Sequence, residues 1–236
     1  MTDLFVPLDD HPAYRQIANV IEQRIVARSL RTGDRLPSET DLARQFGVNR
    51  STIREAIREL EIHGLLGRGR GEKRLRVTRP EHTRVSSGVS RALALHDVTF
   101  LELWEAMMAI EPVAAQYAAA RRSAPQLQAL VRAHARFKRE AADTPAAVSA
   151  VVDFFTAVAA ASGNQVLSIS QAPLNLLLAP ALTRMIDRVP QARARIDTAQ
   201  GKITDAIKLR RSEQARMWME KHINDFKRGH ELEAIA

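Results

Sequence analysis

The sequence predicts a mainly α-helical protein in two parts, and two observations support this fold class. Seven of the ten glycines lie at or before Gly88, so turn-rich chain is confined to the first third. Apolar residues recur at helical spacing through most of the remainder. We expect helices with a two-stranded hairpin in residues 1–79, a linker with a short helix in 80–98, and an all-α bundle of six or seven helices in 99–236.

Composition narrows the class of protein. The chain has 236 residues, of which 45% are hydrophobic and 26% charged, as in ordinary globular proteins. The absence of cysteine excludes disulfide scaffolds, thiol nucleophiles and Cys-based zinc sites. No run approaches ~18 apolar residues and the N-terminus lacks a signal-peptide pattern. We therefore expect a cytoplasmic protein with no membrane contact.

The first part contains three helical signals. Apolar residues at three-and-four spacing predict a helix over residues 12–28. A second helix follows Pro37, with Ser38 placed to cap its start and Gly47 to end it. A third begins at the N-cap Asn49 and runs to about His63.

Basic residues gather in the hairpin that follows. Leu65–Arg68 and Arg74–Thr78 suit two strands around a glycine-rich turn. The twelve residues Arg68–Arg79 hold six basic side chains and one acidic side chain. The net charge of +8 over the whole chain favours an anionic partner only weakly, so this clustering is the stronger signal.

The first turn of the third helix presents two arginines one turn apart, Arg50 and Arg54. A helix of this kind fits the major groove, where arginine bonds guanine edges and Ser or Thr reaches phosphates. The alternative is that both arginines are ordinary solvated surface. Together with the capped helix pair and the basic hairpin, the pattern favours double-stranded DNA as a partner.

The segment LPSETDLARQFGVNRSTIREAIRELEIHGLL resembles the winged helix–turn–helix of the GntR superfamily of bacterial transcription regulators. The resemblance implies a two-stranded wing and binding to a DNA operator. Thr40 departs from the pattern, because FadR-like members often have a DNA-contacting arginine there. The implied DNA-binding residues are Ser38, Thr40, Asn49, Arg50, Ser51, Thr52, Arg54, Arg70, Gly71 and Lys73.

Residues 99–236 resemble the all-helical ligand-binding domain, of FCD type, of the FadR-like branch. The resemblance rests on LWEAMMAIEPVAAQYAAARR, ASGNQVL and ITDAIKLRRSEQARMWMEKHI. It implies a homodimer that binds a small-molecule effector. Helical spacing, with a kink expected at Pro112, predicts helices near residues 99–121, 125–142, 146–161, 165–178, 191–210 and 213–228.

Many relatives bind a metal in this bundle through one Asp and three His. Those positions fall on Val151, Phe155, Gln200 and His222 in this chain, and the first three are not suitable ligands. Asp153 does not replace them, because a residue two positions after Val151 lies about 200° around the helix. We therefore expect no metal and no cofactor.

The predicted effector site has apolar side chains at positions where relatives have charged or metal-binding ones. An arginine that holds a ligand carboxylate in a relative falls on Met107. We expect a largely apolar or acyl-type effector, since Met suits an adaptable apolar wall. The alternatives are a plain core, with His222 as a hydrogen-bonded core residue, or an atypical metal or carboxylate site. The candidate effector residues are Trp104, Met107, Met108, Val151, Phe155, Gln200, Trp218 and His222.

The sequence gives no support for an enzyme. It has no Cys nucleophile, Gly-rich phosphate loop, HExxH or GxSxG. We expect a ligand-responsive transcription regulator, of which repression is the commoner mode among relatives, acting as a homodimer on a pseudo-palindromic operator. The remaining alternative is a sequence-neutral DNA-binding protein.

Overall fold

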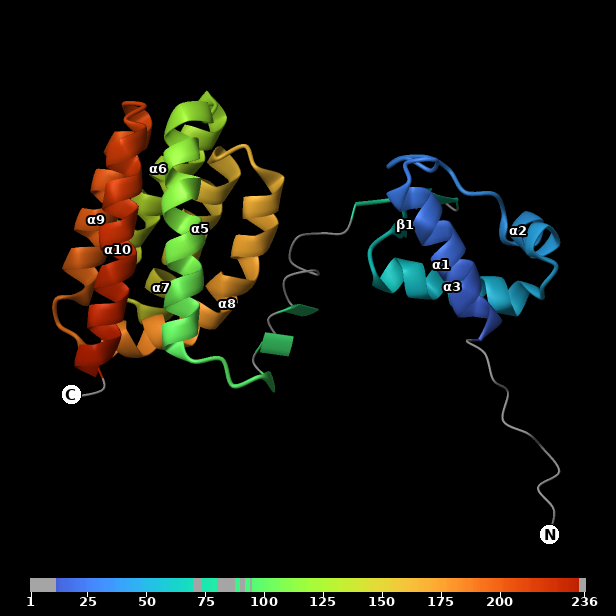
Figure 1. Cartoon of the computed structure of the whole chain (residues 1–236), viewed down its shortest axis with the longest axis horizontal. Helices are drawn as coiled ribbons and strands as arrows, with labels where there is room; N and C mark the ends of the chain where they lie inside the picture. Colours follow the sequence, from blue (N-terminus) through green and yellow to red (C-terminus); the bar gives the residue numbers. More distant parts are fainter. Residues whose placement is uncertain (1–11, 70–73, 80–87, 90–91, 94, 234–236) are drawn as a thin grey trace, which may run out of the picture. The chain divides into compact units, whose positions relative to one another are not determined.

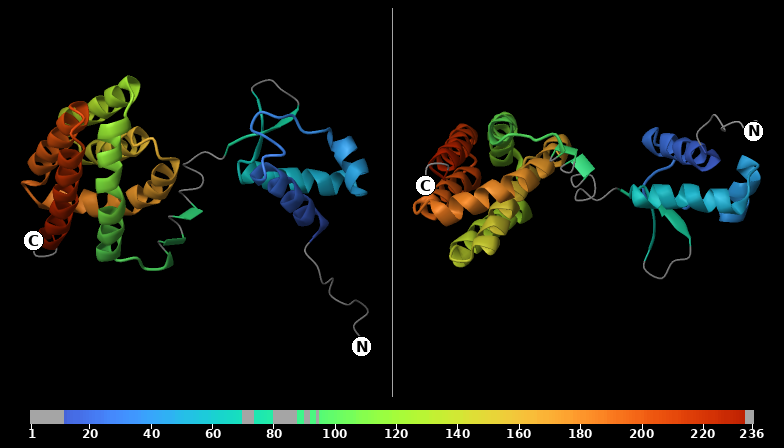
Figure 2. Two further views of the ribbon diagram at one scale, coloured as in Figure 1. Left: turned by 45° about the horizontal axis from the view of Figure 1, so that its top comes forward. Right: turned by 90° about the horizontal axis from the view of Figure 1, so that it is seen from below.

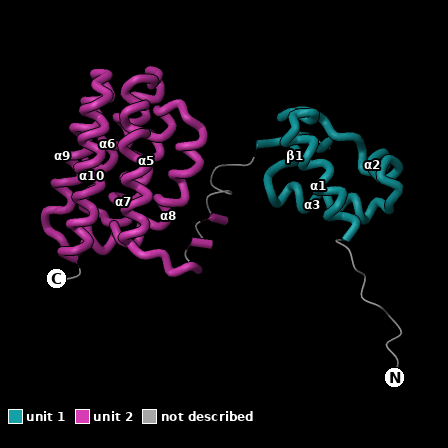
Figure 3. The backbone as a smooth tube through the Cα atoms, in the orientation of Figure 1, with its two compact units in different colours: residues 1–84 teal, residues 85–236 magenta. Residues whose placement is uncertain are grey.

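The computed structural model describes residues 12–69, 74–79, 88–89, 92–93 and 95–233. The chain folds into two compact units, residues 1–84 and residues 85–236 (Figure 3). Within the described residues the regular structure is helical apart from a two-stranded sheet in the first unit (Figure 1). The predicted fold class, a winged helix–turn–helix followed by an all-α bundle, is confirmed.

The first unit is built on α1 (Ala13–Val26), α2 (Glu39–Phe46) and α3 (Arg50–Ile62). Ser38 caps α2 as predicted, since its Oγ accepts the Asp41 N–H at 3.1 Å. Gly47 ends α2 in the left-handed conformation, at φ 66°, also as predicted. Asn49 occupies the N-cap position of α3, but its exposed side chain makes no capping hydrogen bond.

A short antiparallel sheet follows α3. β1 (Leu66–Arg68) pairs with β2 (Leu75–Val77). The segment before α2 lies along the other edge of β2, where the Leu36 N–H donates to the Leu75 C=O at 3.0 Å. Leu75 and Val77 point into the core under the helices, so the wing is anchored to the helix–turn–helix by buried side chains.

Six long helices form the second unit within the described residues: α5 (Phe100–Arg121), α6 (Ala124–Glu140), α7 (Thr144–Ala161), α8 (Gln165–Arg188), α9 (Ala192–Lys208) and α10 (Ser212–Glu233). Figure 2 shows them packed around a shared interior. The largest buried side chains of that interior include Phe137, Phe154 and Phe155.

α5 and α10 run antiparallel along their whole lengths. Near one end the Gln116 amide donates to the Glu213 carboxylate at 2.6 Å. Near the other end the Phe100 and His230 rings stack at 4.0 Å. This pairing fixes which residues of the first and last bundle helices face each other across the core.

α8 differs most from the sequence expectation. The predicted helix ended at residue 178, whereas α8 continues to Arg188 through Pro173 and Pro180. Each proline removes a backbone donor and costs about 3 kcal/mol in a helix interior. Burial contributes about 1.5–3 kcal/mol for each large apolar side chain, which outweighs that cost. The buried apolar side chains of α8 on both sides of the prolines include Leu174, Leu178, Leu182 and Ile186.

Other differences are smaller. α10 continues to Glu233, five residues beyond the expected end. α5 continues through Pro112, which is buried. Apolar spacing also predicts Val148, Val151, Val152 and Phe155 on the inward side of α7, whereas Val152 is only half-buried and Phe154 is buried as well.

α7 and α8 are long and apolar enough, by length and composition alone, to cross a membrane. Core helices of globular proteins have the same property. In the structure the buried sides of both helices belong to the bundle core, through residues such as Phe154 and Leu178.

Candidate DNA interface and effector site

The first turns of α3 present a polar surface. Ile53, Ala56, Ile57 and Leu60 bury one face of the helix in the core of the first unit. The opposite face is exposed at Asn49, Arg50, Ser51 and Arg54, while Thr52 is half-buried. The structure therefore brings the predicted recognition residues to one helix surface, with the two arginines free to extend outward.

The start of α2 lies beside this surface. The Ser38 hydroxyl is already engaged, since it also donates to the Asp41 carboxylate at 2.6 Å. Thr40 is exposed in the first turn. Backbone N–H groups at a helix N-terminus attract anions, but Glu39 and Asp41 already place two carboxylates in this turn.

Glu39 is the carboxylate nearest to the recognition arginines. Its oxygens lie 3.9 Å from Arg50 and 4.0 Å from Arg68, at the outer limit of an ion pair. The Arg50 side chain is 65% exposed. Exposed pairs at such distances contribute little, so both guanidinium groups remain available to an anionic partner. A surface hollow joins these residues with Arg74.

Arg68 and Arg74 are not among the DNA-binding residues implied by the resemblance. The signal that could have found them was the cluster of basic residues in Arg68–Arg79. Arg70, Gly71 and Lys73, the implied contacts at the wing tip, lie outside the described residues. Arg76 has a structural role instead, because its guanidinium donates to the Gly33 C=O at 3.0 Å.

Five predicted effector residues lie in the interior of the bundle, and none is more than 1% exposed: Met107 on α5, Val151 and Phe155 on α7, Gln200 on α9 and His222 on α10. The Phe155 and His222 rings lie nearly parallel, with centroids 5.7 Å apart. The structure thus places side chains from four helices in one closed core.

Several polar atoms in this interior lack a hydrogen-bond partner among the described residues: Gln200 Nε2 and Oε1, Thr204 Oγ1 and His222 Nε2. Gln200 and Thr204 are one turn apart and share the buried face of α9. Burial lowers the pKa of His222 to about 3, so its imidazole is neutral at pH 7. Buried polar groups are normally hydrogen-bonded. This cluster therefore marks the interior as more than apolar packing.

The interior does not fit a metal ion. His222 is the only one of the four relevant positions with a good donor for a transition metal, and Val151 and Phe155 have no donor atom. Asp153 points away, as predicted, and pairs with Arg136 near the surface. The described residues contain no cluster of three His, Asp or Glu able to hold a metal.

The other predicted effector residues lie nearer the surface. Trp104 is half-buried, with the Lys227 ammonium 4.1 Å from the centre of its ring. Trp218 is half-buried beside Lys221, at 4.6 Å. Met108 is also half-buried. These three residues pack against the bundle core and are only partly buried, unlike the five residues in its interior.

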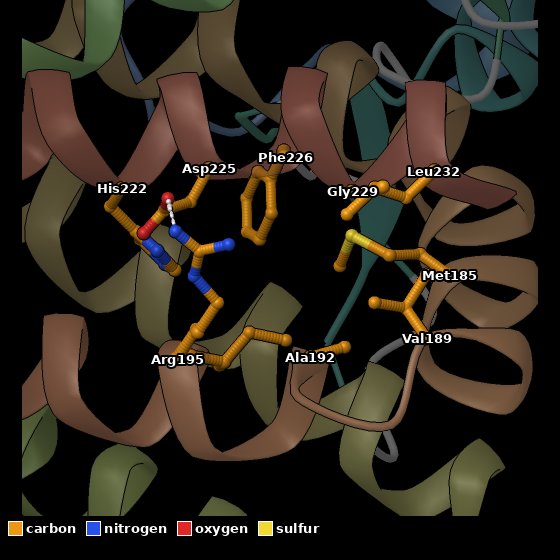
Figure 4. A pocket seen from close by; sticks show the side chains of 10 residues that line it. Met185, Val189, Ala192, Arg195, His222, Asp225, Phe226, Gly229 and Leu232 are labelled. Atoms are coloured by element: carbon orange, nitrogen blue, oxygen red, sulfur yellow. Dashed lines mark ion pairs between the residues drawn. The ribbon is translucent and has the colours of Figure 1, made fainter.

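A small cavity lies between α8, α9 and α10 (Figure 4). Its volume is about 10 Å³, which is room for about one water molecule. The Arg195–Asp225 ion pair, at 2.9 Å, lies at the same end as His222. The apolar lining includes Met185, Val189 and Phe226.

Glu111, one helical turn after Met107, is a buried titratable group that is missing from the candidate effector residues. It is fully buried on α5, and neither carboxyl oxygen has a well-formed hydrogen bond to a described residue. Burial raises its pKa to about 8, and the Gln171 side chain offsets this only partly. The signal available in the sequence was a single acid inside a long apolar stretch of helix.

Comparison with known proteins shows which family of domains each unit matches. Residues 13–73 match the gntR family of bacterial regulatory proteins, and residues 102–225 match the FCD domain. The chain belongs to the GntR family. α2, α3 and the first strand of the wing thus lie in the part of the chain that matches the gntR family, and the bundle is an FCD domain.

Relatives of this GntR-family protein are transcription regulators. The HTH-type transcriptional repressor NanR of Cronobacter sakazakii is 28% identical over 223 residues, which span 92% of this chain and 85% of NanR. NanR of Escherichia coli K12 is 27% identical, over 92% of this chain and 84% of its own. A solved structure of Streptococcus agalactiae GntR, 24% identical, shares the fold with a TM-score of 0.60 and covers 91% of this chain and 99% of that one.

Proposed function

We propose that this GntR-family transcription regulator is a cytoplasmic repressor that binds a pseudo-palindromic operator as a homodimer and responds to a small effector. The observation that carries the proposal is the exposed first turn of α3, where Arg50 and Arg54 stand on a rigid, well-packed helix. Two such helices give the affinity and specificity that one helix lacks. The NanR relatives, which are repressors, support the direction of regulation.

The recognition surface is tested with Arg50→Ala and Arg54→Ala. The operator is first selected from random DNA with the wild-type protein, and binding is then measured by electrophoretic mobility shift. Each variant should bind the operator about 10- to 100-fold more weakly, the loss of about 1–3 kcal/mol expected for a base contact. Affinity for random DNA should fall much less.

Arg139→Ala on α6 is the matched control, because its side chain is 68% exposed and lies in the other unit. It should leave operator binding unchanged. If Arg50→Ala and Arg54→Ala weaken operator and random DNA equally, the protein is a sequence-neutral binder and the proposal is wrong.

We propose further that the effector has an apolar body and one hydrogen-bonding head, as in a fatty, acyl or aromatic acid. The walls of the interior are apolar at Met107, Val151 and Phe155. The unpartnered atoms of Gln200, Thr204 and His222 supply groups for the head. Because the cavity beside His222 is only about 10 Å³, binding needs repacking of the bundle, and that repacking couples the effector to DNA affinity.

Thermal denaturation with a panel of such acids tests the effector class. A ligand at 100 times its Kd stabilises the protein by about 2.7 kcal/mol. The stabilisation should disappear in Gln200→Leu and persist in Val131→Ala, an exposed position on α6. Strong stabilisation by zinc or nickel that His222→Ala removes would show a metal-responsive site instead.

A further inference from the structure

One ion pair of the bundle borders both the solvent and the cavity beside His222. Arg195 on α9 and Asp225 on α10 line that cavity, at the end where His222 lies (Figure 4). The same two residues line a surface hollow of about 270 Å³, together with Trp218 and Lys221. Their side chains are 39% and 33% exposed. The Arg195 guanidinium can therefore be reached from solvent and also faces the interior.

This end of the cavity has an excess of positive charge. Arg195 is the one positively charged side chain among the described residues that line the cavity, since burial lowers the pKa of His222 to about 3 and leaves its ring neutral at pH 7. Of the described residues around the hollow, Lys221 adds a second positive charge and Asp225 carries the only negative charge. Such an excess attracts anions. The candidate effector residues include no Lys or Arg, so Arg195 supplies a charge that they lack.

Asp225 occupies Arg195 in the way that a bound carboxylate does. The Arg195 Nη2 and Asp225 Oδ1 atoms lie 2.9 Å apart. Arginine presents a planar fork of N–H donors that matches the two oxygens of a carboxylate. Ion pairs with this exposure contribute little to stability. A second carboxylate can therefore replace Asp225 at small cost.

The remaining wall of the cavity suits an apolar chain. Val189, Ile196 and Phe226 are buried along it. Met185 packs against Gly229, where a Cβ atom would lie 2.9 Å from the Met185 Cγ. Methionine side chains are unbranched and adaptable, so Met185 is the wall residue best able to move. Its movement enlarges a cavity that has a volume of about 10 Å³ in this structure.

We propose that Arg195 binds the carboxylate of an amphipathic acid in exchange for Asp225, and that the apolar body of the acid takes the place of the Met185 side chain. The proposal rests on the effector class of the proposed function and assigns the group that recognises the charge of its head. His222 lines the same end of the cavity, so the carboxylate stays beside one of the polar groups proposed to hold it. Asp225 acts as an internal competitor.

The test measures binding of sodium octanoate and of its neutral analogue 1-octanol by isothermal titration calorimetry. Arg195→Gln should bind octanoate about tenfold more weakly, the effect of losing a charge-assisted hydrogen bond. Asp225→Asn should bind octanoate about threefold more tightly, in line with the strength of a partly exposed ion pair. 1-Octanol should bind all three proteins alike. A purely structural ion pair does not give effects of opposite sign for its two members.

A second ion pair of the bundle gives matched controls. Arg216 and Glu220 on α10 lie 3.0 Å apart, with side chains 47% and 37% exposed. Arg216→Gln and Glu220→Gln should bind octanoate as the wild type does. Met185→Ala should bind octanoate more tightly, because the shorter side chain leaves room for the apolar body. Circular dichroism and thermal unfolding check that each variant folds.

Three results overturn the site: a wild type that binds octanoate no better than 1-octanol, an Arg195→Gln variant with wild-type affinity, or weaker binding by Asp225→Asn. Octanoate binding that Gln200→Leu abolishes and Arg195→Gln leaves intact supports the proposed effector site and contradicts the role of Arg195. Binding that follows all these expectations without any change in operator affinity contradicts the proposed function and leaves the Arg195 site intact.

Discussion

Glu111 and His222 place ionisable groups in the same bundle core with opposite consequences for stability. Burial raises the pKa of Glu111 to about 8 and lowers that of His222 to about 3. Both groups are therefore neutral at pH 7 in the folded protein. In the unfolded chain Glu111 is ionised above about 4.5 and His222 is protonated below about 6.5. The free energy of unfolding therefore depends on pH through both residues.

The free energy of unfolding rises with pH where the unfolded chain binds more protons than the folded protein, and falls with pH where it binds fewer. The Glu111 contribution is complete below about pH 4.5 and is lost as pH rises to about 8. The His222 contribution is complete above about pH 6.5 and is lost as pH falls to about 3. The two slopes cancel between about pH 4.5 and 6.5, so these residues favour folding most in that window.

We expect Glu111→Gln to remove the decline in stability above pH 6.5. One proton corresponds to about 1.4 kcal/mol per pH unit, so the free energy of unfolding of the wild type should fall by about 2 kcal/mol relative to the variant between pH 6.5 and 8. Urea unfolding at several pH values measures the difference. Glu105→Gln, exposed on the same helix, should keep the wild-type slope. Identical slopes in wild type and Glu111→Gln contradict the assignment.

Among the helices, α8 shows how packing outweighs local preference. The sequence predicted an end near residue 178 because Pro180 disfavours a helix interior. The helix continues because its C-terminal half packs closely on α10. At Gly229 a Cβ atom would lie 2.9 Å from Met185 Cγ and closer still to its sulfur. α8 and α10 therefore approach each other through a glycine.

We expect Gly229→Ala to destabilise the protein by about 1–3 kcal/mol, as for other overpacked cores, although alanine favours a helix by about 1 kcal/mol. In a Met185→Ala background the same change should cost much less, because the added methyl then has room. Gly201→Ala, where a Cβ would lie 3.3 Å from His134 Cε1, is the comparison within another helix. Equal costs of Gly229→Ala in both backgrounds would falsify the close approach.

On the scale of the whole molecule, basic residues are arranged differently in the two units. The first unit presents arginines around α2, α3 and the wing, where they face solvent. In the bundle, several arginines pair with acidic residues, as in Arg195–Asp225 and Arg136–Asp153. The clustered arginines of the first unit therefore suit an anionic partner, in line with the proposed DNA binding.

The dimer of the proposed function should determine operator affinity. We expect the wild type to bind a full operator at least 100-fold more tightly than a single half-site at nanomolar protein, since two recognition helices then act together. Mobility shifts on full and half operators measure this. Equal affinity for half and full sites contradicts the proposed dimer.

The sequence by itself determined the order of the two units, the cap at Ser38, the glycine end at Gly47 and the start of the third helix after Asn49. These features follow from short-range spacing, which a single sequence displays directly. It also showed that three of the four positions at which relatives bind a metal, Val151, Phe155 and Gln200, hold residues that are not suitable ligands.

Only the tertiary structure decided the rest. The length of α8 through two prolines, the burial of Glu111, the partial burial of Trp104 and Trp218, and the exposure of Leu176 all depend on contacts between distant segments. Apolar spacing predicts that a helix has an inward face. It does not predict which apolar residues stay outside when, as in residues 172–182 of α8, every position but Asn175 is apolar, because burial is fixed by the helices that pack on either side.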